Sequence, residues 1–139
     1  EDHKDEDTSG RTDPLTLLAP GSRHVILGDP GSGKSTLLKF LSLVGWHKAL
    51  QERFGQTPDE RIPLLIVLRQ YADELKTRRD LSIMEYAAER ANKELGLTAI
   101  SEEFLLYHLC VGRGIILLDG IDELPGLEFK QLIGRPTRC

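Results

Sequence analysis

The sequence has few cysteines and no long apolar run. Only two cysteines occur, Cys110 and Cys139, and no C-x-x-C pair is present. Their spacing predicts neither a disulfide framework nor a zinc site. No apolar stretch approaches the roughly 20 residues that a membrane-spanning helix needs, and the first residues do not resemble a signal peptide. These absences predict a cytoplasmic setting and no membrane insertion.

An excess of positive charge is also missing. Lys and Arg number 18 against 22 Asp and Glu, which gives a net charge of −4. The chain therefore offers no general attraction to nucleic acid or anionic lipid, and we expect neither as a partner. The short basic run of Lys76, Arg78 and Arg79 is typical of a solvated loop. The four histidines show no metal-ligand spacing.

The organisation of the chain predicts one partial domain after a linker. The first residue is Glu1 and the only methionine is Met84, so we expect a piece of a longer protein. Residues 1–14, EDHKDEDTSGRTDP, are acidic and then polar without an apolar side chain, which predicts a flexible linker. The whole chain has 40% hydrophobic and 29% charged residues, which is typical of a globular protein. We expect residues 15–139 to form the partial domain.

Three short apolar runs predict buried strands. They are HVIL at 24–27, IPLLIVL at 62–68 and IILL at 115–118. None alternates with polar residues, and continuous runs of this kind suit a parallel sheet that is covered on both faces.

Helices are predicted between these strands, over residues 34–50, 82–95 and 101–111. The first carries an apolar face made of Leu37, Leu38, Leu41 and Val44. Ser82 opens the second with a capping box, and Ser101 is the expected N-cap of the third. Alternating strands and helices predict an α/β layered fold, in which ligands bind beyond the carboxyl ends of the strands.

A phosphate-binding loop is predicted directly after the first run. The stretch GDPGSGKS matches G-x-x-x-x-G-K-[ST] between a predicted strand and a predicted helix. Lys34 would contact the β and γ phosphates, the Ser35 hydroxyl would bind Mg²⁺, and the helix dipole would add positive potential. The residues expected around the nucleotide are Gly28, Asp29, Pro30, Gly31, Ser32, Gly33, Lys34, Ser35 and Thr36.

The third run ends in a carboxylate that suits the metal side of such a site. Asp119 follows four apolar residues, and a carboxylate placed beside the core costs several kcal/mol unless it is paired or bound to a metal. Asp122 and Glu123 follow closely, and one or both could polarise a water for attack on the γ phosphate. The alternative is a surface turn with two solvated acids.

With these motifs in place, the sequence resembles the NACHT domains, which are signal-transduction P-loop ATPases of innate immune sensors and many bacterial proteins. The resemblance lies in GDPGSGKSTLL at 28–38, IPLLIVLRQYA at 62–72 and above all LLDGIDEL at 117–124. The last segment is similar to the apolar-D-G-x-D-E signature of that family, which is far more specific than the phosphate loop alone. The resemblance spans roughly residues 15–125.

The resemblance implies a P-loop NTPase three-layer fold with a parallel sheet, truncated after the strand that ends at Asp119. It implies ATP or ADP with Mg²⁺, with Lys34 and Ser35 on the phosphates and metal, Asp119 as the Walker B acid, and Asp122 or Glu123 as the catalytic acid. It also implies a switch in which nucleotide exchange permits the parent protein to form a homo-oligomer.

The same resemblance implies that part of the fold is missing. The family's later strands, its sensor arginine and its winged-helix region have no counterpart here. One later strand would lie between the phosphate-loop strand and the Asp119 strand, so we expect a gap in the sheet with unpaired backbone edges. Hydrolysis by this piece alone is not expected.

Three other functions remain as alternatives. A transport or motor ATPase is disfavoured because no L-S-G-G-Q-like signature lies between the motifs, and a GTPase because no N-K-x-D follows Asp119. A scaffold that binds nucleotide without hydrolysis stays open. We expect Phe40 and Trp46 to pack against the domain, and Arg69 and Tyr71 to anchor the loop after their strand.

Overall fold

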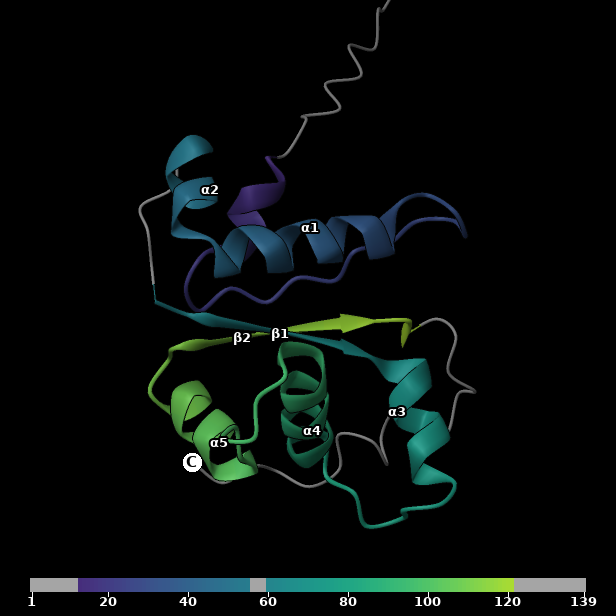
Figure 1. Ribbon diagram of the computed structural model, residues 1–139. Helices are drawn as coiled ribbons and strands as arrows, with labels where there is room; N and C mark the ends of the chain where they lie inside the picture. The colour runs from purple at the N-terminus through teal and green to yellow at the C-terminus, as the bar shows by residue number, and fades with distance from the viewer. Residues whose placement is uncertain (1–12, 56–59, 122–139) are drawn as a thin grey trace, which may run out of the picture.

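The computed structural model describes residues 13–55 and 60–121. In them a two-stranded parallel sheet is covered by helices on both sides, which is compatible with the predicted α/β class (Figure 1). The elements are η1 (Pro14–Leu18), α1 (Lys34–Trp46), α2 (Lys48–Arg53), β1 (Ile62–Val67), α3 (Leu68–Leu75), α4 (Ile83–Leu95), α5 (Glu102–Cys110) and β2 (Gly114–Asp119). Helices α1 and α2 lie on one side of the sheet, and α3, α4 and α5 lie on the other.

The register of the two strands brings their carboxyl ends together. Ile62 is opposite Gly114 at one end of the ladder, and Val67 is opposite Asp119 at the other. Because the strands are parallel, Asp119 and the start of α3 lie at the same edge of the sheet. This is the edge where the sequence places its candidate chemistry.

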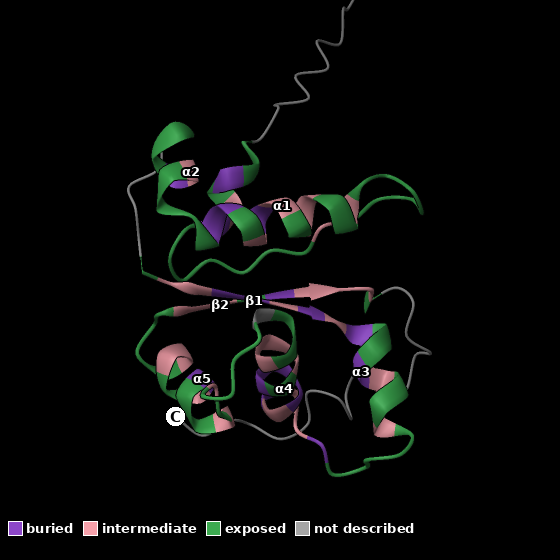
Figure 2. Ribbon diagram, viewed as in Figure 1, coloured by how far each residue is buried: buried purple, intermediate pink, exposed green. Residues whose placement is uncertain are grey.

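Two hydrophobic clusters hold the layers together (Figure 2). The cluster on the side of α3 to α5 is Leu64, Ile66, Leu68, Tyr71, Leu81, Met84, Tyr86, Ala87, Ala88 and Leu105. The cluster under α1 is Leu15, Leu18, Leu41, Val44 and Leu117. Successive residues of a strand point to opposite faces, so the strands supply side chains to both clusters.

The predicted helices form with the expected caps. Ser82 accepts a hydrogen bond from the Glu85 amide at 2.9 Å, and Ser101 accepts one from the Phe104 amide at 3.1 Å. Helix α4 ends at Gly96 in the left-handed conformation, with a φ of 64°. The helix predicted over 34–50 is broken at His47, whose extended backbone separates α1 from α2.

Two helical elements are not in the sequence prediction. Helix α3 starts at Leu68 with no intervening loop, so the run predicted as a strand to residue 68 changes to helix after Val67. The 3₁₀ helix η1 begins with Asp13, whose side chain accepts from the Leu15 amide at 2.9 Å, and with Pro14 at its first position. The predicted linker over 1–14 therefore overlaps η1, and residues 1–12 lie outside the described part.

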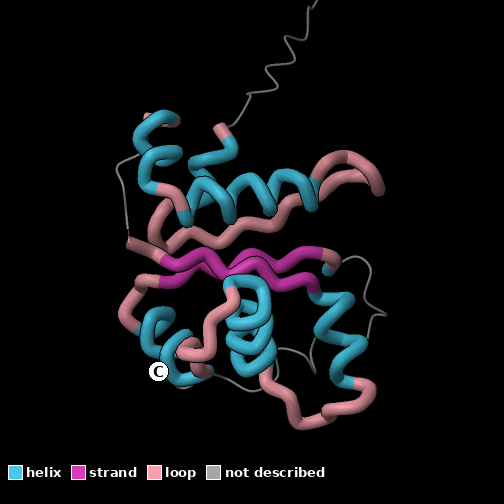
Figure 3. Tube along the Cα trace, in the orientation of Figure 1, coloured by secondary structure: helices cyan, strands magenta, loops and turns pink. Residues whose placement is uncertain are grey.

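The prediction of a buried strand at 24–27 is wrong. This segment has no assigned secondary structure, and Val25 and Leu27 are 79% and 87% exposed (Figure 3). A strand needs a neighbour for its amides and carbonyls, and in the described residues β1 and β2 pair only with each other. Burial of β2 on both faces is also not observed, since Ile116 is 44% exposed. The prediction that Trp46 packs against the domain is not met by its exposed side chain.

Cys110, the last residue of α5, is disulfide-bonded. The cysteine spacing, which predicts no disulfide framework, does not indicate this bond. The only other cysteine, Cys139, lies outside the described residues. Within residues 13–55 and 60–121, none of the helices combines the length and apolar character of a membrane span.

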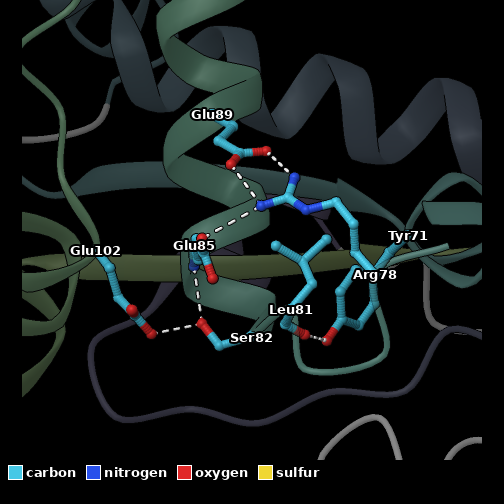
Figure 4. A network of polar contacts seen from close by, with 7 residues as sticks. All are labelled: Tyr71, Arg78, Leu81, Ser82, Glu85, Glu89 and Glu102. Carbon is cyan, nitrogen blue, oxygen red and sulfur yellow. Dashed lines mark hydrogen bonds and ion pairs between the residues drawn. The ribbon is translucent and has the colours of Figure 1, made fainter. Parts of the chain in front are cut away.

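A polar network fixes the connection between α3 and α4 (Figure 4). The buried Tyr71 donates its hydroxyl to the Leu81 carbonyl at 2.8 Å and so anchors the segment that precedes α4. The prediction that Tyr71 anchors a loop directly after its strand is wrong, because α3 begins there. Arg78 forms an ion pair with Glu89 at 2.6 Å and with Glu85 at 3.2 Å. The Arg78 hydrogen bond lowers the pKa of Glu89, while burial raises the pKa of Tyr71. The network therefore combines one buried hydrogen bond between neutral groups with ion pairs between exposed side chains.

Replacing Tyr71 by Phe removes the hydroxyl and leaves the Leu81 carbonyl without its partner. We expect the free energy of unfolding to fall by about 1 kcal/mol, the usual value for one buried neutral hydrogen bond. Urea titration of the chain measures this change. Tyr107→Phe is the matched control, because Tyr107 is exposed; equal losses in the two variants would contradict the anchoring role.

Candidate functional site

The loop from Gly28 to Gly33 leads directly into the N-terminus of α1. Ser32 donates its amide to the Asp29 carbonyl at 3.1 Å, which closes a turn. Gly31 and Gly33 have positive φ values of 81° and 90°, a region that other residues rarely adopt. A side chain at Gly28 would collide with Ser32, since its Cβ would lie 2.7 Å from Oγ. The backbone of the loop thus favours glycine at positions 31 and 33, whereas at Gly28 the constraint is the neighbouring Ser32 side chain.

The Lys34 side chain folds back over this loop. Its Nζ donates to the Gly28 carbonyl at 2.5 Å and to the Asp29 carbonyl at 3.0 Å. Both acceptors are solvent-exposed backbone groups of the motif itself. The ammonium group is therefore held at the mouth of the loop, where the sequence predicts that it meets phosphate.

Ser35 and Asp119 are in direct contact. The Ser35 hydroxyl donates to Oδ1 of Asp119 at 2.9 Å, although the two residues are 84 positions apart. Ser35 belongs to the first turn of α1, and Asp119 is the last residue of β2. The structure thus brings together two of the residues that the sequence places around a metal ion.

Oxygen ligands of this kind fit Mg²⁺. Two oxygens at about 2.0–2.1 Å from an octahedral Mg²⁺, at right angles to each other, are about 2.9–3.0 Å apart. The 2.9 Å between Ser35 Oγ and Asp119 Oδ1 is compatible with this spacing, and it is also the ordinary length of the hydrogen bond that joins them. Within the described ranges, no cluster of three or more His, Cys, Asp or Glu side chains could hold a metal. A Mg²⁺ here would thus need further oxygens from water or from a ligand.

The N-terminus of α1 fits an anionic group. Its N-cap, Gly33, has no side chain to cap the helix, and no acidic residue lies in the first turn. The first amides of an α-helix lack carbonyl partners within the helix, and an anion satisfies them while interacting with the helix dipole. Lys34 adds a positive charge beside them.

The remaining predicted residues divide into two groups. Asp29, Pro30 and Ser32 lie in the exposed turn, and Thr36 is exposed on α1. Asp122 and Glu123, the predicted water-positioning acids, lie outside the described residues, which end at Ile121. The described residues therefore include the predicted phosphate and metal ligands but not the predicted catalytic acids.

Sequence reasoning expected Arg69 at the ligand edge of the sheet but missed the helix α3 that begins there. Because Val67 pairs with Asp119, the first turn of α3, with Arg69 in it, follows the strand next to the candidate metal ligand. A usable signal was present: Leu68, Tyr71 and Leu75 recur at helical spacing directly after the apolar run.

No family model, curated protein or solved structure matches this chain. The resemblance to NACHT domains therefore rests on the motif residues alone.

The contact between Ser35 and Asp119 should be measurable without any ligand. We expect a double-mutant cycle of Ser35→Ala and Asp119→Ala to give a coupling energy of about 1 kcal/mol in the presence of a chelator, since one hydrogen bond to a carboxylate is shared by the pair. Urea unfolding of the four proteins provides the numbers.

The matched control is the same cycle with Thr36→Ala in place of Ser35→Ala. Thr36 is the next residue of α1 and is exposed, so its effect should add to that of Asp119→Ala within about 0.3–0.5 kcal/mol. Additive behaviour of Ser35 and Asp119 would contradict the observed contact.

Proposed function

We propose that the chain is the Mg-ATP- and ADP-binding module of a signal-transduction switch protein, built as a P-loop NTPase of the NACHT type. Nucleotide exchange or hydrolysis would control the assembly of the parent protein. The observation that carries the proposal is the hydrogen bond between Ser35 and Asp119 at 2.9 Å, because it joins the two sequence motifs at one edge of the sheet.

In this proposal, different site residues bind the phosphates and the metal ion. The uncapped amides at the start of α1 and the ammonium group of Lys34 bind the phosphates. Ser35 and Asp119 supply oxygens to Mg²⁺, either directly or through water. The ion, when bound, neutralises charge on the phosphate oxygens. Asp119 is thereby paired, which offsets the cost of placing a carboxylate beside the apolar end of β2.

In this proposal, nucleotide replaces contacts that the protein makes with itself. Lys34 must release the Gly28 and Asp29 carbonyls to reach a phosphate, and the Ser35 hydroxyl would exchange its hydrogen bond to Asp119 for a bond from its oxygen to the metal. Both changes occur at the first turn of α1. Hydrolysis requires a positioned water in addition, and we assign that role to Asp122 or Glu123.

A thermal-shift titration tests the binding proposal. Ligand at about 100 times its Kd should stabilise the folded chain by about 2.7 kcal/mol. We expect Mg-ATP and ADP to raise the midpoint, GTP to raise it less, and Lys34→Ala to remove most of the effect. Lys39→Ala is the matched control, because Lys39 lies on the same helix and is exposed. A full shift in Lys34→Ala would refute the phosphate assignment.

A second measurement separates a switch from a motor or transport ATPase. A switch should change its oligomeric state between ADP and Mg-ATP while turning over slowly, whereas a motor should hydrolyse steadily at constant size. Sedimentation velocity and phosphate release on the same samples give both quantities. Rapid turnover without a nucleotide-dependent change in size would exclude the switch.

A further inference from the structure

Arg69 lies in the first turn of α3, directly beyond the strand pair that ends at Asp119. Val67 is both the N-cap of α3 and the residue that pairs with Asp119 in the parallel ladder. Neighbouring strands are about 5 Å apart, and Arg69 is two residues beyond Val67. The backbone therefore places an exposed arginine next to the carboxylate that contacts Ser35.

The first turn of α3 adjoins the carboxyl edge of the sheet. In an α-helix every Cα–Cβ bond is tilted toward the helix N-terminus, and long side chains follow this direction. The N-terminus of α3 is at the end of β1 (Figure 1), so the Cβ of Arg69 is tilted back toward this edge. Leu68 and Tyr71 bury another side of the same turn, with 0% and 3% of their surfaces exposed.

Other arginines near the sheet and α4 are placed differently. Arg61 and Arg113 directly precede β1 and β2, so they lie at the amino edge of the sheet, away from the candidate site. Arg78 and Arg90 form ion pairs with glutamates of α4. Arg69, by contrast, follows a strand at the edge that carries the candidate site.

Asp73 is the acidic neighbour of Arg69 on α3, one turn further along the helix. Lys76 lowers the pKa of Asp73 most, through a hydrogen bond and through its charge, and Arg69 contributes less. The Asp73 carboxylate is 2.7 Å from Lys76 Nζ. Since Lys76 already compensates this carboxylate, Asp73 does not prevent Arg69 from binding another anion.

The proposed nucleotide would bring its terminal phosphate to this position. In phosphoryl-transfer sites Mg²⁺ bridges the β and γ phosphate oxygens, and the described ligands for such an ion are Ser35 and Asp119. A γ phosphate bound to that ion would lie beside Asp119, at the end of the strand pair that Arg69 follows. ADP lacks this phosphate, so a residue that contacts it distinguishes the two nucleotides.

We propose that Arg69 binds the γ phosphate and thereby raises the affinity of the site for Mg-ATP relative to Mg-ADP. A guanidinium group can donate two parallel hydrogen bonds to phosphate oxygens, and such charge-assisted pairs are stronger than hydrogen bonds between neutral groups. This inference rests on the proposed function and names the residue by which that site distinguishes its two nucleotides.

Calorimetric titration with Mg-ADP and with a non-hydrolysable Mg-ATP analogue tests this assignment. Arg69→Gln removes the charge and keeps a polar side chain. We expect it to weaken binding of the ATP analogue about tenfold or more, the usual effect of losing a hydrogen bond to a charged group, and to change ADP binding less than about twofold. Arg69→Lys should keep part of the preference, because an ammonium group is a point charge without the planar fork of arginine.

Arg79→Gln is the matched control, since it removes the same charge from an exposed position between α3 and α4. This variant should bind both nucleotides as wild type does. Because Arg69 is exposed as well, circular dichroism should show unchanged folding in all three variants.

Three outcomes would overturn the inference and leave the proposed function intact: an Arg69→Gln variant that binds both nucleotides as wild type does, one that loses both equally, or an Arg79→Gln variant with the same effect as Arg69→Gln. Lys34→Ala tests the proposed function itself, because this variant should lose both nucleotides. A wild-type chain that binds neither nucleotide refutes the proposed function, and the assignment of Arg69 fails with it.

Discussion

The parallel pairing of β1 with β2 is the constraint on which the other features depend. Six residue pairs from Ile62–Gly114 to Val67–Asp119 place two carboxyl ends at one edge. Side chains from both strands reach the two clusters that hold the helical layers. Asp119 can meet Ser35 only because α1 is packed across these strands by Leu41 and Val44, which have almost no exposed surface. A shift of register by one residue would move Asp119 to the other face of the sheet.

Local signals in the sequence predict local structure well. Ser82 and Ser101 start their helices through the hydrogen bonds that their side chains make, and the spacing of Leu41 and Val44 identifies the buried face of α1. These outcomes depend on interactions within one turn. The close approach of α1 to β1 is different, because Gly45 lies so close to Pro63 that an added Cβ would be 3.0 Å from its Cγ. Such a contact between distant segments has no signature in the sequence.

The segment at 24–27 shows where composition is insufficient. Its four residues have the character of a buried strand, yet Val25 and Leu27 face solvent. The energy of a strand comes from pairing and from burial, and both require a neighbour that the described residues do not contain. The residues of the loop from Gly28 to Gly33, by contrast, are placed by the glycines at 31 and 33 and by the start of α1. This explains why the candidate site could be located from sequence while the strand before it could not.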